Sequence, residues 1–196
     1  IRKGAGEPSV IAIAFQTILE MEGFRTTLTS RDVDDIAAYL AVRFEVTAAP
    51  QTAAAVEYYH QAFDHYFVTA IADEITKLDN GTFVGWRRTG LHFDVYKAPS
   101  AGTSPVCRFF SNAFGDKSSH FYTASPSECA VVKTNPSWTF EGEVFHVQTP
   151  QADGSCATGH VPVYRLYNDG KGAAPNHRLT SETGVQSEMQ TAGWIP

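Results

Sequence analysis

The sequence predicts a mainly β protein with short helices, in which three pseudo-symmetric β-rich repeats pack around a threefold axis after an N-terminal helical segment. Two observations lead to this prediction. Of the 24 aromatic residues, 20 follow residue 50, where Gly, Pro, Asn and Asp recur every few residues and the apolar runs are short. The same part of the chain aligns with itself in three stretches, at a period of about 50 residues. Units of this size cannot each bury an apolar face alone, so we expect them to pack together.

Residues 1–46 are predicted to be helical. A first apolar stripe runs from Val10 to Met21. A second helix starts at Thr29-Ser30-Arg31-Asp32, where a capping hydroxyl precedes an acidic residue in the first turn, and it ends near Arg43. Residues 47–55 have no charge and no large apolar group, so they are predicted to be a linker.

The three repeats are predicted at residues 56–96, 107–147 and 164–196. Each opens with an aromatic strand, continues through a polar loop to a second short strand that closes on a threonine, and then enters a short helix. These threonines are Thr69, Thr123 and Thr180, and we expect their hydroxyls to cap the helices. A tryptophan follows each helix, and we expect the three to occupy equivalent places: Trp86, Trp138 and Trp194. The sequence stops two residues after Trp194, so we expect the closing strands of the third repeat to come from elsewhere or to lie beyond Pro196.

The pattern YYxxxxDHYFVT…GWxRTGxxFxVY, VCRFF…SHFYT…W…EGxxFxV, PVYRLYN…NHRLT…GW covers residues 56–196. It resembles a repeat family of unknown function in bacterial secreted and cell-surface proteins. The resemblance implies an accessory module and an extracellular or periplasmic location. In that family the last tryptophan is usually followed by Glu-Gly, further strands and a terminal cysteine.

The stretch MEGFRTTLTSRDVDDIAAYLAVRF within residues 1–44 is similar to the axial-methionine loop and last helix of a c-type cytochrome domain. This similarity implies that Met21 would be the sulfur ligand of a haem iron. The C-x-x-C-H attachment motif does not occur in the chain, so a haem c cofactor would need residues upstream of Ile1. We therefore expect no cofactor in this chain.

Three cysteines are an odd count for a disulfide-stapled domain, and the loss of a terminal cysteine would account for it. We predict at most one disulfide, between Cys129 and Cys156, because both belong to the second repeat or its exit. Cys107 is then the thiol without a partner.

The composition excludes several functions. A net charge of −6 and a pI of about 5.6 argue against nucleic-acid binding. The longest apolar run, residues 10–15, is far too short to span a membrane. There is no G-x-S-x-G nucleophile motif and no phosphate-binding loop.

Three sets of residues leave alternatives open. The histidines His65, His120 and His177 recur at nearly one register, where they either hold a divalent metal or fix a turn by hydrogen bonds. Glu74 and Glu128 either stabilise the first turns of their helices by their negative charge or form a hydrolytic acid–base pair. The aromatic residues either fill the repeat cores or face outward as platforms for sugar rings or for another protein chain.

We therefore predict an exported, non-catalytic binding module for a cell-surface glycan or a partner protein. The alternative is an accessory or assembly domain of a c-type cytochrome electron-transfer protein. The candidate ligand-binding residues are strand ends that meet polar loops: Tyr59, His60, Phe110, Asn112, Tyr167 and Asn168.

Overall fold

The computed structural model describes residues 28–43 and 50–196. The chain divides into two compact units, residues 1–49 and residues 50–196. Within the described part of the chain, no helix is both long and apolar enough to cross a membrane. Met21, the first predicted helix, and residues 21–27 and 44 of the cytochrome-like stretch lie outside the described residues.

In the first unit, helix α2 (Ser30–Arg43) confirms the helix predicted there. Its start is fixed by reciprocal hydrogen bonds between two residues. The Asp32 backbone N–H donates to Thr29 Oγ1 at 3.2 Å, and the Thr29 backbone N–H donates to the Asp32 carboxylate at 2.7 Å. This pairing satisfies N–H groups that the first turn of a helix otherwise leaves without a partner.

The second unit is mainly β, as predicted. Its elements follow the chain in the order β1 (Thr52–His60), β2 (His65–Thr69), α3 (Ala72–Asp79), β3 (Trp86–Tyr96), β4 (Thr103–Phe114), β5 (Lys117–Thr123), α4 (Pro126–Val132), β6 (Thr139–Gln148), β7 (Tyr164–Tyr167), the 3₁₀ turn η3 (Lys171–Ala173), β8 (His177–Thr180) and α5 (Thr183–Thr191).

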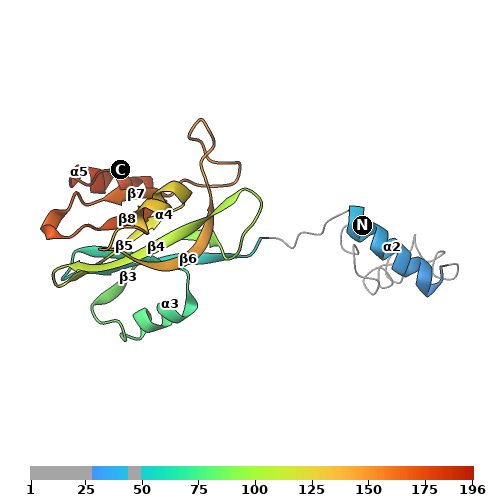
Figure 1. Cartoon of the computed structure of the whole chain (residues 1–196), viewed down its shortest axis with the longest axis horizontal. Helices are drawn as coiled ribbons and strands as arrows, with labels where there is room; N and C mark the ends of the chain where they lie inside the picture. The colour runs from blue at the N-terminus through green and yellow to red at the C-terminus, as the bar shows by residue number, and fades with distance from the viewer. Residues whose placement is uncertain (1–27, 44–49) are drawn as a thin grey trace. The chain divides into compact units, whose positions relative to one another are not determined.

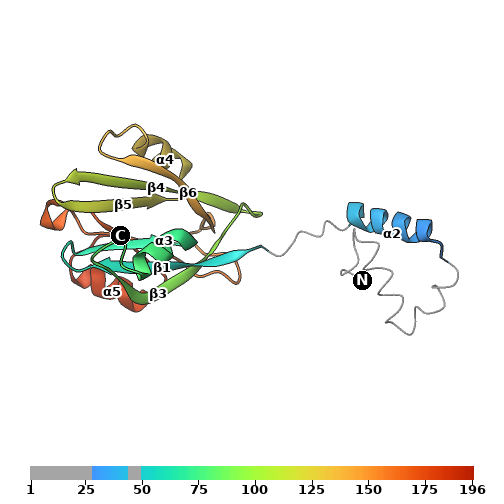
Figure 2. The same cartoon turned by 90° about the horizontal axis from the view of Figure 1, so that it is seen from below.

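The strands form a six-stranded antiparallel sheet and a two-stranded sheet. The larger sheet has the order β2-β1-β3-β6-β4-β5, and β7 pairs with β8. The larger sheet consists of two trios, β2-β1-β3 and β5-β4-β6, and the strand pairing between them is limited to Tyr96 of β3 and His146 of β6. Figure 2 shows α3 beside β1 and β3, and α4 beside the trio β5-β4-β6. In Figure 1, β7, β8 and α5 lie together at one end of the unit.

We call β1 to β3 with α3, β4 to β6 with α4, and β7 and β8 with α5 the three strand groups. The register of the first two strands is the same in all three groups. Each threonine that closes a second strand lies opposite a residue of the preceding strand: Val56↔Thr69, Cys107↔Thr123 and Tyr164↔Thr180. Each threonine hydroxyl accepts a hydrogen bond of 3.0–3.1 Å from the backbone N–H two residues further on. These N–H groups belong to the residues that precede the helices, so the threonines shape the turn before each helix and are not themselves the caps. The threefold arrangement of the groups remains a prediction.

Strand β1 begins inside the segment that we predicted to be a linker. The prediction for residues 47–55 is therefore wrong from Thr52 onward. Ala55 is fully buried and lies opposite Phe93 of β3, so its small side chain leaves room for the neighbouring aromatic ring. Thr52 and Ala54 are exposed, and a composition argument cannot separate such a strand from a linker.

Three buried polar side chains, His65, Ser119 and Asn176, connect the strand groups, and we call them the cluster of His65, Ser119 and Asn176. His65 Nδ1 lies 2.6 Å from the Ser118 carbonyl oxygen. Ser119 Oγ donates to the Pro175 carbonyl. Asn176 accepts from the Tyr66 backbone N–H at 2.9 Å and donates to the Tyr66 carbonyl. These contacts run from β2 to β5, from β5 to the start of β8, and from there back to β2.

Three ion pairs join the same groups in sequence. Arg108 of β4 pairs with Glu74 of α3 at 2.6 Å, and Arg165 of β7 pairs with Glu128 of α4 at 2.8 Å. The third pair, Arg178 of β8 with Glu57 of β1, is formed at 2.9 Å. In the first two pairs, an arginine on the first strand of a group meets a glutamate on the helix of the group before it in the chain, and the third pair joins the last group to the first.

The disulfide joins Cys107 and Cys129, so the predicted pairing of Cys129 with Cys156 is wrong. Cys107 lies in β4 and Cys129 in α4, with a Cα–Cα distance of 6.1 Å. Both are buried against Phe109 and Phe121. Helix α4 folds back beside the trio β5-β4-β6 and brings together two cysteines that are 22 residues apart in the chain. Cys156 is a free thiol in the loop before β7.

Replacing both Cys107 and Cys129 by alanine should lower the free energy of unfolding by about 3 kcal/mol, because the cross-link restricts the unfolded chain over a loop of this length. Urea unfolding at pH 7 measures the loss. The matched control is Cys156→Ala, which removes a thiol without a bond and should cost less than about 1 kcal/mol. Equal losses in the two variants would contradict the assignment.

Candidate functional site

A pocket of about 440 Å³ lies between α3, the loop at residues 80–85 and the strands β4 to β6. The loop forms its outer wall and exposes Phe83 and Val84 to solvent. Gly85 fixes the path of this loop, with φ of +89°. A Cβ atom at Gly85 would collide with the ring of His60, so only glycine lets the loop lie this close to β1. We call this cavity the Arg108 pocket.

Aromatic rings form one side of the Arg108 pocket. Trp86, Phe67 and Phe110 all line it, and Trp86 and Phe110 are half-buried, so part of each ring is accessible. His120 lies between the phenylalanines, with ring centroids 4.4 Å from Phe67 and 5.3 Å from Phe110. A surface of this kind can stack on the apolar face of a ring-shaped ligand.

Charged groups line the same pocket beside these rings, with the guanidinium of Arg108 5.3 Å from the centre of the Phe67 ring. Arg108, with a side chain 5% exposed, donates to both oxygens of Glu74 at 2.6 and 2.8 Å, and its Nε donates to Glu141 at 2.7 Å. Burial alone would raise the pKa of Glu74, but hydrogen bonds from Arg108 and Thr69 outweigh burial and lower that pKa. Burial raises the pKa of Glu141 against the opposing charge of Arg108. One cation therefore faces two carboxylates, which leaves acceptor oxygens for hydroxyl or ammonium donors.

A second cluster of the same kind lies between β5 and β7. Phe121, His177 and Tyr167 take the places of Phe67, His120 and Phe110, with His177 5.0 Å from both neighbouring rings. Trp138 packs on Phe121 at 6.1 Å, as Trp86 packs on Phe67 at 5.8 Å.

Trp194, at the end of the chain, has a different neighbour. It packs on Tyr66 at 5.9 Å, because the charged Arg178 stands at the position where the other groups have a phenylalanine. We predicted equivalent places for the three tryptophans. Trp86 and Trp138 both pack on a phenylalanine, whereas Trp194 packs on a tyrosine.

Of the six ligand-binding residues predicted from the sequence, four lie at the ends of β1 and β7, whereas Phe110 and Asn112 lie inside β4. Of these, only Phe110 lines the Arg108 pocket. His60 is buried and stacks on Phe63 at 3.7 Å. Tyr59 and Tyr167 are half-buried, and Asn112 is exposed. Asn168 is buried, and its amide accepts from the backbone of Gly170 and Asn176, so it shapes its own turn. The ligand-binding role of these residues remains a prediction.

The recurring histidines do not form a cluster that could share a metal. Within residues 28–43 and 50–196 there is no group of three His, Cys, Asp or Glu side chains placed to hold one. His65 makes the carbonyl contact that the alternative hypothesis expected. Burial lowers the pKa of His120 to about 3 and that of His177 to about 4, so both rings are neutral at pH 7.

The arginines are the residues that sequence reasoning missed. Arg108 and Arg165 hold the same position in their strands, one residue after the partner of the threonine. Glu74 and Glu128 hold equivalent positions in α3 and α4. This double recurrence could have predicted the ion pairs, since paired opposite charges at fixed positions indicate contact between units.

A family model described as a domain of unknown function (DUF5648) matches residues 55–196. No curated protein and no solved structure matches the chain.

Proposed function

The chain belongs to the DUF5648 family across residues 55–196, and we propose that this module is a non-catalytic glycan-binding module of an exported protein. The Arg108 pocket is its binding site. One observation carries the proposal: the pocket places the accessible rings of Trp86 and Phe110 next to the carboxylates of Glu74 and Glu141. Sugar rings need this combination, because one face of the ring is apolar and its edge is lined by hydroxyl groups.

The charge of the pocket favours a particular class of glycan. Arg108 is already bound by two carboxylates and has little capacity left for an anion. Glu141 keeps an oxygen beyond the one that accepts from Arg108 and can accept from a sugar hydroxyl. The pocket therefore suits neutral or amino sugars better than acidic ones.

The pairing of the carboxylates supports binding without catalysis. Glu74 and Glu128, the pair considered for acid–base chemistry, are each held by their own arginine. Two carboxylates held in different ion pairs do not form the shared site that hydrolysis of a glycosidic bond requires.

We also propose that the three strand groups are pseudo-symmetric repeats around an axis. The common register, the cluster of His65, Ser119 and Asn176, and the three ion pairs support this arrangement. Repetition would present similar shallow sites several times, which increases the avidity for a polymer.

An extracellular or periplasmic location forms part of the proposal. The disulfide between Cys107 and Cys129 supports it, because disulfides persist in oxidising compartments. The alternative function, an accessory domain of a c-type cytochrome, rests on α2 in the place where the similarity expects the last helix. The haem absorbance of the natural protein separates the two.

A glycan array incubated with the full chain tests the proposal, followed by calorimetry with the best neutral or amino-sugar ligand. Trp86→Ala and Glu141→Gln should each weaken binding at least tenfold, which is about 1.4 kcal/mol, because one removes the stacking surface and the other an acceptor. The melting temperature of each variant shows whether it remains folded.

Phe140→Ala is the matched control, because Phe140 is an exposed aromatic residue of β6 outside the pocket. It should leave binding unchanged. Signals at background for every glycan would contradict the proposal, as would release of new reducing ends from a bound glycan.

A further inference from the structure

The charges that line the Arg108 pocket do not balance. Arg108 is the cation of the lining, and two carboxylates, Glu74 and Glu141, accept hydrogen bonds from it at 2.6–2.8 Å. The remaining titratable side chain of the lining is His120, which is neutral at pH 7 because burial lowers its pKa to about 3. One positive and two negative charges leave the pocket with one negative charge in excess.

Glu141 holds the carboxylate oxygen that is open to a ligand. Both oxygens of Glu74 accept from Arg108, and Thr69 Oγ1 also donates to one of them. Glu141 accepts from Arg108 through Oε2, and its Oε1 has no hydrogen-bond donor within residues 50–196. The Glu141 side chain is 27% exposed, so a molecule in the pocket can reach this oxygen.

The aromatic rings of the pocket attract the same kind of charge. The face of an aromatic ring carries partial negative charge, so a cation placed over it is stabilised. Arg108 already lies over the Phe67 ring in this way. Trp86 and Phe110 line the pocket with part of each ring accessible. A second cation in the pocket would therefore be attracted by Glu141 and by these rings, whereas a neutral group would gain only a hydrogen bond.

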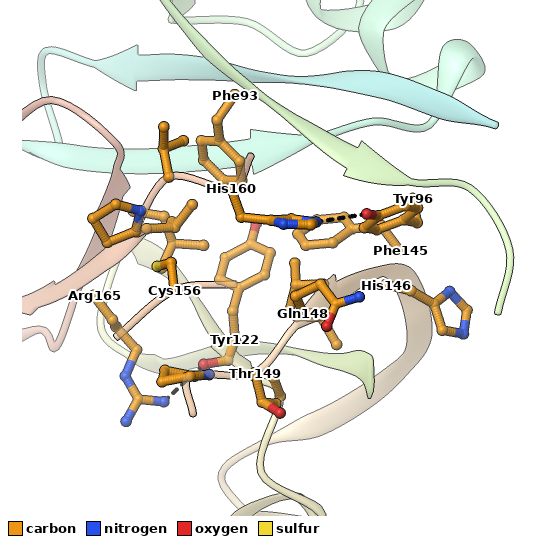
Figure 3. Close-up of a pocket in the computed structure, with 18 of the residues that line it drawn as sticks. Phe93, Tyr96, Tyr122, Phe145, His146, Gln148, Thr149, Cys156, His160 and Arg165 are labelled. Atoms are coloured by element: carbon orange, nitrogen blue, oxygen red, sulfur yellow. Dashed lines mark hydrogen bonds between the residues drawn. The ribbon is translucent and has the colours of Figure 1, made fainter. Parts of the chain in front are cut away.

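The ion pair of the second cluster lacks this excess charge. Arg165 pairs with one carboxylate, that of Glu128, and also donates to the carbonyl oxygen of Tyr122 at 2.9 Å. Both members of the pair line a different pocket, of about 500 Å³, and Figure 3 shows the guanidinium of Arg165 turned away from the ring of Phe93 there. A second carboxylate on the arginine thus distinguishes the Arg108 pocket from the cluster that otherwise resembles it.

We propose that the Arg108 pocket selects a glycan with free, protonated amino groups, such as a 2-amino sugar without an N-acetyl group. This inference rests on the function proposed above and narrows it to one class of glycan. The ammonium group donates to Glu141 Oε1 and balances the excess charge, while the sugar ring stacks on Trp86. An N-acetylated sugar offers a neutral amide instead, and a hydrogen bond between charged partners is about twice as strong as one between neutral groups.

Three β-1,4-linked tetrasaccharides, of glucose, glucosamine and N-acetylglucosamine, test the selectivity by calorimetry with the full chain at pH 6.5. The glucosamine form should bind more tightly than either of the others by about tenfold or more, because its ammonium group meets an unbalanced carboxylate. The glucose form is the control for size, since its hydroxyl group is as small as the amine but neutral. Equal affinity for the three would overturn this inference and leave glycan binding in place. Binding of none of them, with a glycan array at background, would overturn both.

Protein variants show whether Glu141 is the cause. Glu141→Gln keeps the size of the side chain and removes the excess charge, so the preference for the glucosamine form should fall to about twofold or less, whatever happens to the affinity for the neutral forms. The matched control is Glu143→Gln, which makes the same change in net charge at an exposed residue of β6 outside the pocket and should keep the preference. A preference that survives Glu141→Gln would overturn the proposal. A lysine tetrapeptide that binds as tightly as the glucosamine form would also overturn it, because the pocket would then recognise an ammonium group without a sugar.

Discussion

Replacing Glu57 by alanine should destabilise the protein by about 3–5 kcal/mol, because it leaves a buried guanidinium without a counter-charge. The Glu57 side chain is 2% exposed, and it accepts two hydrogen bonds of 2.9 Å from Arg178, whose side chain is 10% exposed. The cation of Arg178 also lies 4.1 Å from the centre of the Tyr66 ring. Urea unfolding at pH 7 gives the loss in free energy of unfolding.

A double variant separates the ion pair from simple truncation. Glu57→Leu with Arg178→Leu removes both charges, so it should be more stable than Glu57→Ala alone. The matched control is Asp73→Ala, which breaks the exposed pair between Lys77 and Asp73 and should cost less than about 1 kcal/mol. A loss below about 1 kcal/mol for Glu57→Ala would show that this pair does not hold the module together.

The second large effect is a loss of stability in mild acid. The folded protein keeps His120 and His177 neutral, since burial lowers their pKa values to about 3 and about 4, whereas the unfolded chain takes up protons near pH 6.5. Stability that is complete above pH 6.5 is therefore lost as the pH falls toward the folded pKa values. From pH 6.5 to pH 5, each histidine should contribute a loss of about 2 kcal/mol.

The groups around His120 do not reverse this sign. Arg108 and His65 oppose a charge on the ring, and Glu141, 3.7 Å away, favours one. Around His177, Arg165 opposes the charge and Glu128 favours it. Burial is the largest cause for both histidines and lowers both pKa values.

Denaturant unfolding at pH 7, 6 and 5 measures the effect. His120→Phe and His177→Phe should each flatten the dependence on pH, whatever their effect on stability at pH 7. His92→Phe, at an exposed histidine of β3, is the control and should keep the slope of the parent protein. Identical slopes in all variants would exclude the two buried rings as the cause.

The sequence predicted the parts of the fold that depend on local pattern. Thr29 and Asp32 mark the start of α2 through a contact between neighbours in the chain. The threonines that close β2, β5 and β8 were found because strands and turns repeat at a fixed spacing. The β class follows from the same local signals.

Contacts between distant parts of the chain could not be found in this way. Cys107 and Cys129 meet because α4 folds back beside β4, a placement that sequence distance does not reveal. The Arg108 pocket depends on the loop that Gly85 permits. The ion pairs were missed because the charge at this position is not the same in all three groups. Glu57 stands in the first group where Arg108 and Arg165 stand in the other two, so the arginine does not recur three times.

The partner of Glu57 bears on how the chain folds during synthesis. Arg178 lies 121 residues after Glu57, and Asn176 contacts Tyr66 across 110 residues. Contacts of such high order close large loops, which makes folding slow relative to that of helical proteins of equal size. A nascent chain that has not yet reached β8 lacks these closing contacts, so the module completes its fold only after almost all of it has been made. A protein that must be exported before it folds would benefit from this delay.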